Sequence, residues 1–429
     1  LVYIPRKKTE SGNYFIQHVI KLLQKKHRLG RIYGGGWRVW TTFHPGLQQT
    51  LEKVIQEDFT IDAPKDRQIA ALVMDSNNGE VFALSGGRDF EASPFNRATQ
   101  AKRQPGSAIK PLLYATALEQ SFQPNSTFED SVLIYNWDDK GEEKIYAPKN
   151  YDGLYGEERL LRNHLGGKYR SDMMTLGKAL ELSINTIAVQ LLDPIGVNFF
   201  IEKSKEMNLE IERESGLCLA LGCSETNLLD LTSSYSVFLN QGHYKKPTFI
   251  KRIVDSNGNL IYQASQKDAE KVFSSKTILQ MQDLLGRVIK NGTGRNALWY
   301  GDNKTMLGKT GTSSNDRDAW FVGAIPELLT GFWIGHDENL PMPGEQGGRT
   351  PARLWRSFNQ EALPFIQKKK MLQLPEPIYL GTCQVSGLIA TENCPDVAHY
   401  PYFDEHIPNQ LCHLHPGEIL LKPLKPAFD

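Results

Sequence analysis

A serine and a lysine three residues apart, Ser107 and Lys110, are the residues of this 429-residue chain best suited to covalent chemistry. They follow a proline and a glycine and precede good helix formers with apolar residues at helical spacing, so Ser107 is expected to open a helix. Residues three apart on a helix share a face, which would put the lysine amine beside the serine hydroxyl. The pair has the parts of an activated nucleophile, although a lone S-x-x-K is far more often a solvated helix start.

Two more motifs could join this pair. Ser183 and Asn185 offer a hydroxyl and an amide within a mostly apolar helical stretch. Residues 309–312, with the sequence K-T-G-T, put a glycine in a β-rich run, where glycine often marks the close approach of a ligand. Each has a simpler interpretation, because S-x-N is usually a loop or a helix cap and K-T-G-T could be an edge strand guarded by its lysine. Neither motif alone indicates catalysis.

The elements that must position these residues are a sheet and a long helical region. Five short runs rich in β-formers are predicted to be strands: residues 68–74, 80–84, 305–312, 319–325 and 328–334. The first two form a hairpin of central strands, and the last three an antiparallel meander. Helices and loops fill residues 112–290 and end with an amphipathic helix at 275–290. This order predicts an α/β or α+β domain whose mainly antiparallel sheet joins both ends of the chain.

The flanking segments are simpler. A modest amphipathic helix is expected at 15–23, a strand at 37–43 and a helix at about 47–58. From about residue 370 the chain is rich in proline, histidine and cysteine with little periodicity, which predicts an irregular appendage.

Composition excludes several classes of protein. The 49 basic and 49 acidic residues leave a formal charge of zero, which removes any global argument for nucleic-acid binding or electrostatic membrane attachment. No apolar run is long enough for a transmembrane helix, and the first residues lack the apolar region of a secretory signal.

The five cysteines are unevenly placed. Cys218 and Cys223 are expected to be packing residues, while Cys383, Cys394 and Cys412 lie in the last fifty residues. The segment C-H-L-H at 412–415 lacks a C-x-x-C partner of zinc-finger type, so no metal site and no cofactor are predicted. A disulfide within the C-terminal group and free thiols there stay equally open.

The three motifs together, in the order S-x-x-K, S-x-N and K-T-G-T, resemble the superfamily of penicillin-binding proteins and serine β-lactamases. The flanking sequences R-Q-P-G-S at 103–107, D-A-W-F-V-G at 318–323 and G-F-W-I-G at 331–335 resemble the transpeptidase domain of class A penicillin-binding proteins, over residues 35–365. The resemblance implies a five-stranded, mainly antiparallel sheet flanked by helices, with an all-helical subdomain.

The resemblance also implies roles for the catalytic residues. Ser107 would attack the carbonyl between the last two D-alanines of a peptidoglycan stem peptide, and Lys110 would take its proton. Ser183 would pass a proton to the leaving amine, and Asn185 would bind the substrate amide and Lys110.

The substrate would be held by the third motif. Lys309, Thr310 and Thr312 would hold its carboxylate, and Gly311 would let the strand approach it. The N–H groups of Ser107 and Thr312 would form the oxyanion hole.

The same resemblance implies a domain plan: a linker region at 1–60 after an absent glycosyltransferase domain, a transpeptidase domain at 61–368 and a C-terminal irregular extension at 369–429. No E-D-x-x-F-x-x-H motif is found, so glycosyltransferase activity is expected to be absent. The expected location is the extracytoplasmic face of the bacterial inner membrane, with the anchor missing from this chain. The expected partners are stem peptides and β-lactam antibiotics, and no nucleic acid.

Four alternatives stay open. A D,D-carboxypeptidase or a β-lactamase would pass the acyl group to water, and a β-lactamase would be expected to carry a deacylating glutamate, which we do not identify. A β-lactam sensor or a peptidoglycan-binding scaffold would not turn over substrate at all.

Overall fold

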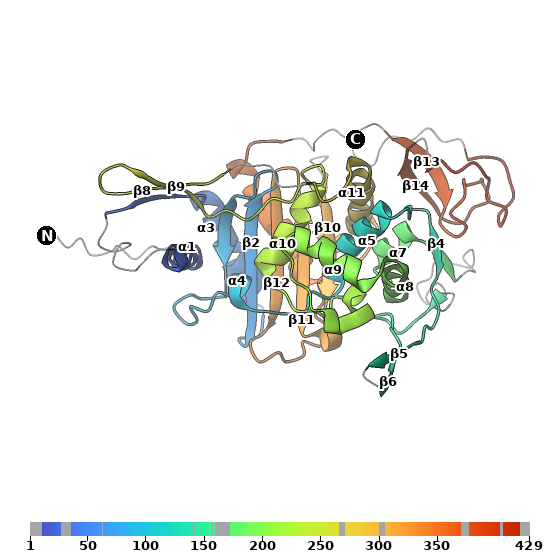
Figure 1. Cartoon of the computed structure of the whole chain (residues 1–429), viewed down its shortest axis with the longest axis horizontal. Helices are drawn as coiled ribbons and strands as arrows, with labels where there is room; N and C mark the ends of the chain where they lie inside the picture. Colours follow the sequence, from blue (N-terminus) through green and yellow to red (C-terminus); the bar gives the residue numbers. More distant parts are fainter. Residues whose placement is uncertain are drawn as a thin grey trace.

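A five-stranded antiparallel sheet forms the centre of the molecule (Figure 1). The computed structural model describes residues 11–26, 36–61, 63–139, 142–156, 158, 172–265, 271–299, 305–369, 377–403 and 406–420. The strand order is β10-β11-β12-β2-β3. The bounds are Arg67–Asp75 for β2, Val81–Ser85 for β3, Leu307–Thr312 for β10, Asp318–Ala324 for β11 and Leu328–His336 for β12. The predicted mixed α/β fold with an antiparallel sheet is confirmed, and β2 pairs directly with β12 from the far end of the domain.

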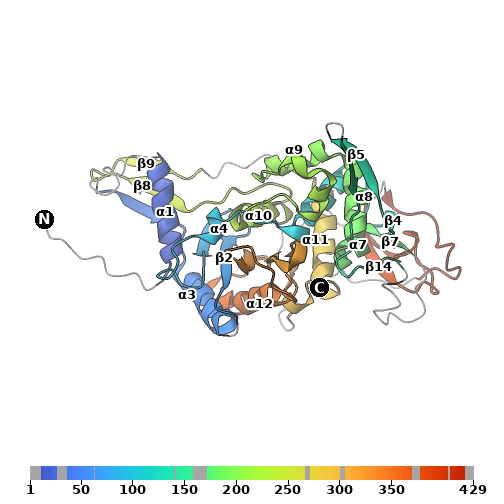
Figure 2. The ribbon, with the colours of Figure 1, turned by 90° about the horizontal axis from the view of Figure 1, so that it is seen from below.

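Both faces of the sheet are covered, which explains why its strands read as continuous apolar runs. On β2, Ile69, Ala71 and Val73 pack with helices α3 (Pro45–Val54) and α12 (Thr350–Ala362). The alternate residues of β2 face the larger core of the helical region. Figure 2 shows α3 and α12 on one side of the sheet and α10 (Leu228–Ser234) on the other.

The helical region holds the catalytic candidates that do not lie on the sheet, among them Lys110, Ser183 and Asn185. Its other main helices are α5 (Lys110–Glu119), α7 (Leu176–Leu182), α8 (Asn185–Ile195), α9 (Val197–Glu206) and α11 (Ser275–Lys290). Residues 110–118 of α5 are all buried, as expected of a helix that is apolar around its whole circumference. Helix α11 matches its predicted range and packs against α5, α7 and β10, so it connects the helical region to the sheet.

The smaller elements complete the fold. Three strands, β1 (Arg38–Thr41), β8 (Ile250–Val254) and β9 (Leu260–Gln263), form a second sheet at the end of the molecule where α1 (Asn13–Lys26) lies. Two-stranded sheets are made by β4 (Thr127–Glu129) with β7 (Met173–Thr175) and by β5 (Tyr135–Asp139) with β6 (Glu142–Tyr146). The short helical segments are η1 (Ile55–Thr60), α4 (Arg97–Gln100), η2 (Gly106–Ile109), η3 (Arg213–Leu221), η4 (Tyr235–Phe238), η5 (Arg295–Ala297), η6 (Ser314–Asp316) and η7 (Leu363–Phe365).

Several expectations need correction. Strand β3 is an edge strand and not a central one, because β2 pairs with β12 on its other side. The helix expected to reach residue 58 ends at Val54 and continues as the π-helical η1. Cys218 and Cys223, expected to be packing residues, are joined by a disulfide with their Cα atoms 5.7 Å apart.

The C-terminal segment, expected to be irregular, contains an antiparallel pair, β13 (Ile378–Cys383) and β14 (Val397–Tyr402). It docks on the start of α7. The N–H of Thr175 donates to Gln384 O at 3.0 Å, and its hydroxyl lies 2.8 Å from Tyr400 Oη. Arg287 of α11 donates to His399 O at 2.6 Å. This extension is therefore packed on the helical region.

Parts of the predicted linker (1–10 and 27–35) and of the extension (370–376, 404–405 and 421–429) lie outside the described residues. Within the described part of the chain, no helix is both long and apolar enough to cross a membrane.

Candidate active site

Ser107 lies in a tight 3₁₀ turn directly before α5. The turn spans Gly106–Ile109, and the N–H of Lys110 donates to the carbonyl of Ser107. Residues three apart eclipse one another in a 3₁₀ turn, so Lys110 follows Ser107 on the same side. Ser107 is half-buried, whereas Lys110 is fully buried at the start of α5. The expected helix start at Ser107 is thus a 3₁₀ turn, with the α-helix beginning at the lysine.

The buried amine of Lys110 connects this turn to the S-x-N motif. Its Nζ donates to Asn185 Oδ1 at 2.7 Å and to the carbonyl oxygens of Ser183 and Ile184 at 2.8 and 3.2 Å. The Ser183 hydroxyl lies 3.4 Å from the same nitrogen. Two motifs that are 73 residues apart in sequence are therefore joined by one side chain.

Ser183 owes its position to an unusual backbone conformation. It caps the C-terminus of α7 in the left-handed region, with φ 60° and ψ 40°, and α8 begins two residues later at Asn185. Serine is uncommon in the left-handed region, because holding its backbone there costs on the order of 1 kcal/mol or more. The break between the two helices leaves the carbonyls of Ser183 and Ile184 available to Lys110.

The third motif approaches the same hydroxyl from the sheet. Lys309 lies on the edge strand β10, is fully buried, and donates from Nζ to Ser183 Oγ at 2.8 Å. Burial lowers the pKa of Lys309 from 10.5 to about 7. Ser183 Oγ therefore lies between two lysines, one from α5 and one from β10.

Glycines allow the nucleophile turn to touch strand β10. A Cβ on Gly311 would overlap the carbonyl oxygen of Pro105, and one on Gly106, where φ is +54°, would overlap that of Thr312. The turn and the strand are thus in backbone contact at Gly311, the glycine at which the sequence predicts the approach of a ligand.

The two threonines of the motif differ in their surroundings. Thr310 is buried, and its hydroxyl lies 2.8 Å from that of Thr293 and 3.4 Å from Lys309 Nζ. Thr312 is half-buried, and its hydroxyl accepts from the N–H of Gly347 at 3.2 Å. Thr293 was not among the sequence candidates, because it follows the end of α11 in what reads as a helix-terminating segment.

A buried polar network behind Asn185 was also missed. Asn150 Oδ1 accepts from the N–H of Asn185 at 2.9 Å, and Asn150 Nδ2 donates to Asp130 Oδ1 at 2.7 Å. The same Asp130 oxygen accepts from Thr186 Oγ1 at 2.6 Å. Asp130 and Asn150 stand in irregular segments far upstream of the S-x-N motif, and no local pattern singles them out. They fix the start of α8 and hence the amide that contacts Lys110.

Similarity to known proteins agrees with this geometry. Residues 69–331 match the model of the family described as the penicillin binding protein transpeptidase domain. Penicillin-binding protein 2D of Bacillus subtilis is 32% identical over 361 residues, which is 82% of this chain and 49% of that protein. Penicillin-binding protein 1A of Aquifex aeolicus is 35% identical over 334 residues, 77% of this chain and 43% of that protein. The chain spans about half the length of these curated relatives.

Solved structures share the fold. Penicillin-binding protein 1A of Haemophilus influenzae matches with a TM-score of 0.75 and 20% identity, over 93% of this chain and 77% of that one. The PonA1 protein of Mycobacterium tuberculosis, solved in complex with penicillin V, matches with a TM-score of 0.70 and 21% identity, over 89% of this chain and 98% of that one.

Proposed function

Because the chain belongs to the penicillin-binding protein transpeptidase family, we propose that it is a D,D-transpeptidase that cross-links peptidoglycan stem peptides through an acyl-enzyme on Ser107. The observation that carries this proposal is the convergence of Lys110 and Lys309 on the Ser183 hydroxyl, beside the turn that presents Ser107. β-Lactams would acylate the same serine.

Acylation begins with attack of Ser107 Oγ on the carbonyl carbon between the last two D-alanines. Lys110 takes the serine proton as the C–O bond forms; this step uses the uncharged amine, whose lone pair replaces one of the three N–H donations described above. The contact between Lys110 Nζ and Ser183 Oγ gives that proton a route to the leaving nitrogen. The C–N bond then breaks, D-alanine leaves with the proton, and Ser107 holds the acyl group as an ester.

Transfer follows the same route in reverse. The amine of a neighbouring stem peptide attacks the ester carbonyl and gives up a proton through Ser183 and Lys110 while the bond to Ser107 Oγ breaks. The product is an amide cross-link, and the serine regains its proton.

Residues of β10 would bind the negatively charged carboxylate of the substrate. Lys309 in its ammonium form, with the hydroxyls of Thr310 and Thr312, would bind the terminal carboxylate. The N–H groups of Ser107 and Thr312 would bind the oxyanion, a device in which the loss of one donor typically costs about 10²- to 10³-fold in rate. The backbone contact of the nucleophile turn with β10 supports this pairing, because Gly106, next to Ser107, lies against the backbone of Thr312.

The domain boundaries and the cellular location are also proposed from membership of this family. We place the linker region at 1–60, the transpeptidase domain at 61–368 and the C-terminal extension at 369–429. The site would face peptidoglycan outside the bacterial inner membrane, with a membrane anchor and a glycosyltransferase domain in the full-length protein.

Incubation with a labelled penicillin tests the proposal. We expect one covalent adduct, located on Ser107 by peptide mass spectrometry, that lasts many minutes. Release within seconds would instead indicate a β-lactamase, and an adduct that survives Ser107→Ala would refute the assignment of the nucleophile. Supplying a D-Ala-D-Ala peptide with an acceptor amine distinguishes cross-linking from hydrolysis, because a carboxypeptidase would give only the shortened peptide.

A further inference from the structure

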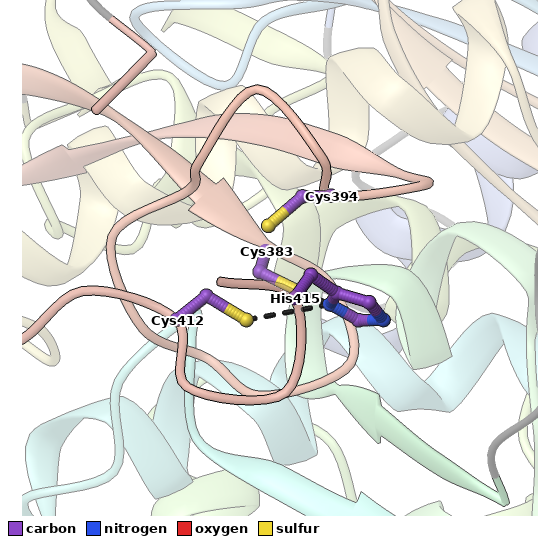
Figure 3. A group of neighbouring side chains, drawn as sticks. All are labelled: Cys383, Cys394, Cys412 and His415. Carbon is purple, nitrogen blue, oxygen red and sulfur yellow. Dashed lines mark hydrogen bonds between the residues drawn. The ribbon is translucent and has the colours of Figure 1, made fainter. Parts of the chain in front are cut away.

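Three cysteines and a histidine meet in the C-terminal extension, at the opposite end of the molecule from α1 (Figure 1). The side chains of Cys383, Cys394, Cys412 and His415 point toward one another (Figure 3), and their four ligand atoms all lie within 4.8 Å of one another. Cys383 ends β13, Cys394 lies in the loop before β14, and the other two belong to the last described segment. Three separate parts of the extension therefore contribute to one cluster.

We propose that this cluster is a structural zinc site in which Cys383, Cys394, Cys412 and His415 bind one Zn²⁺ through three sulfurs and the Nδ1 of the histidine. Tetrahedral bonds of about 2.3 Å to sulfur and about 2.0 Å to nitrogen place the ligand atoms about 3.5 to 3.8 Å apart. His415 Nδ1 lies 3.3 Å from Cys412 Sγ and 3.6 Å from Cys383 Sγ. The ligands thus already have nearly the spacing that zinc requires.

The donor set favours zinc over a disulfide. In the described part of the chain these three cysteines are free thiols, whereas Cys218 and Cys223 are paired. Three thiols cannot all pair within one chain, and a disulfide between any two would leave the third beside the histidine. A set of three cysteines and one histidine is a common closed zinc set, with no position left for a substrate, so the site is structural and not catalytic.

Hydrogen-bond donors surround the sulfurs. Ser386 Oγ donates to Cys412 Sγ at 3.2 Å, and the N–H of Thr391 donates to Cys394 Sγ at 3.3 Å. Three thiolates and one Zn²⁺ carry a net charge of −1, and such donors offset the excess charge on the sulfurs. The loops around the cluster therefore suit metal-bound thiolates.

Among the described residues, the loops around the cluster have little apolar core of their own. Its own apolar cluster consists of Cys383, Val385 and Cys412, with Met173 and Cys394 packed against it. A single two-stranded sheet is marginal by itself, and small units with so little core usually depend on disulfides or a metal. Bound zinc would replace the missing core.

The sequence predicts no metal site, because residues 412–415 have no C-x-x-C partner. The available signal was instead C-x-x-H at 412–415, which supplies two ligands from one short turn. Cys383 comes beside them when residue 389 bridges Thr382 and Leu411, and Cys394 lies three residues after Thr391, which bridges Ile419. The spacing of the cysteines along the chain could not reveal this.

The zinc content of the full chain, purified without chelators, tests the proposal. We expect about one Zn²⁺ per chain in the wild type and in the Cys218→Ser/Cys223→Ser control, and about a tenfold loss in Cys412→Ser and His415→Ala. Replacement of zinc by Co²⁺ should give the thiolate charge-transfer absorption of a tetrahedral site. A wild type that stays free of metal after exposure to Zn²⁺, or a disulfide between two of the three cysteines in peptide mapping, would overturn it.

A second measurement on the wild type covers the case in which the variants do not fold. Chelation should make about three additional thiols per chain reactive toward a thiol reagent, and Zn²⁺ alone should protect them again. Thiols that react equally with and without Zn²⁺ would contradict the proposal. Because the readout is thiol reactivity, failure of the zinc site would leave the penicillin test of Ser107 unaffected.

Discussion

Replacing Lys309 with methionine should remove the pH dependence of acylation by penicillin. Burial lowers the pKa of Lys309 to about 7, so in the free protein its ammonium form is lost as pH rises through neutrality. If that ammonium binds the carboxylate of penicillin, binding requires the protonated form and weakens above this pKa. The second-order rate constant of acylation reports groups of the free protein and should therefore follow the titration of Lys309.

The size of the effect follows from the pKa. A lysine with a pKa of about 7 is about 90% charged at about pH 6 and about 1% charged at about pH 9, so the rate constant should fall toward that of the uncharged form, about 10- to 100-fold over this range. At about pH 6, Lys309→Met should cost the charge-assisted hydrogen bond to the carboxylate, about 1.5 to 3 kcal/mol or roughly 10- to 150-fold. The variant's remaining activity should change little with pH.

The assay is the rate of covalent labelling by a fluorescent penicillin at several concentrations and pH values. Lys53→Met is a matched control, because Lys53 lies on α3 across the sheet and pairs with Glu361 at 2.8 Å. It should keep the wild-type profile. A flat profile in the wild type, or the same decline in Lys309→Met, would refute the role of Lys309 in holding the carboxylate.

Three further substitutions probe the rest of the site. Ser107→Ala should abolish labelling while the free energy of unfolding in urea changes by no more than about 0.5 kcal/mol; a larger change would give Ser107 a structural role. Asn150→Ala removes the acceptor of the Asn185 N–H and one of the donors to the buried Asp130 carboxylate, so unfolding should become easier by about 1 to 3 kcal/mol and labelling should slow; an unchanged urea midpoint would argue against this support. Gly311→Ala should slow labelling at least about tenfold, because its Cβ overlaps the carbonyl of Pro105 and separates β10 from the nucleophile turn; wild-type labelling would show that the contact is dispensable.

The sheet and the long helices could be predicted from sequence because their signals are local. Strands buried on both faces read as apolar runs, and helix α11 carries a clear amphipathic period. The three motifs lie on these elements or at their ends, so their approximate contexts were also predictable. The strand order was not, because β3 reads like a central strand although it lies at an edge.

What could not be predicted depends on contacts between distant residues. The left-handed conformation of Ser183 has no sequence signal, since serine rarely adopts it. The support from Asp130 to Asn185 runs through a side-chain network across irregular segments. The cysteines of the extension are brought together by isolated β-bridges between segments that are separate in sequence.

The extension docks on one end of the short helix α7, and Ser183 lies at the other end. Thr175, held by Gln384 and Tyr400 of the extension, caps the start of α7, and Ser183 caps its end, about 12 Å further along the helix. A ligand that orders one end of such a helix changes the free energy of arrangements at the other, and this coupling acts equally in both directions. Occupancy of the proposed metal site and reversible binding of substrate beside Ser183 would then be thermodynamically linked, with each favouring or opposing the other by the same factor.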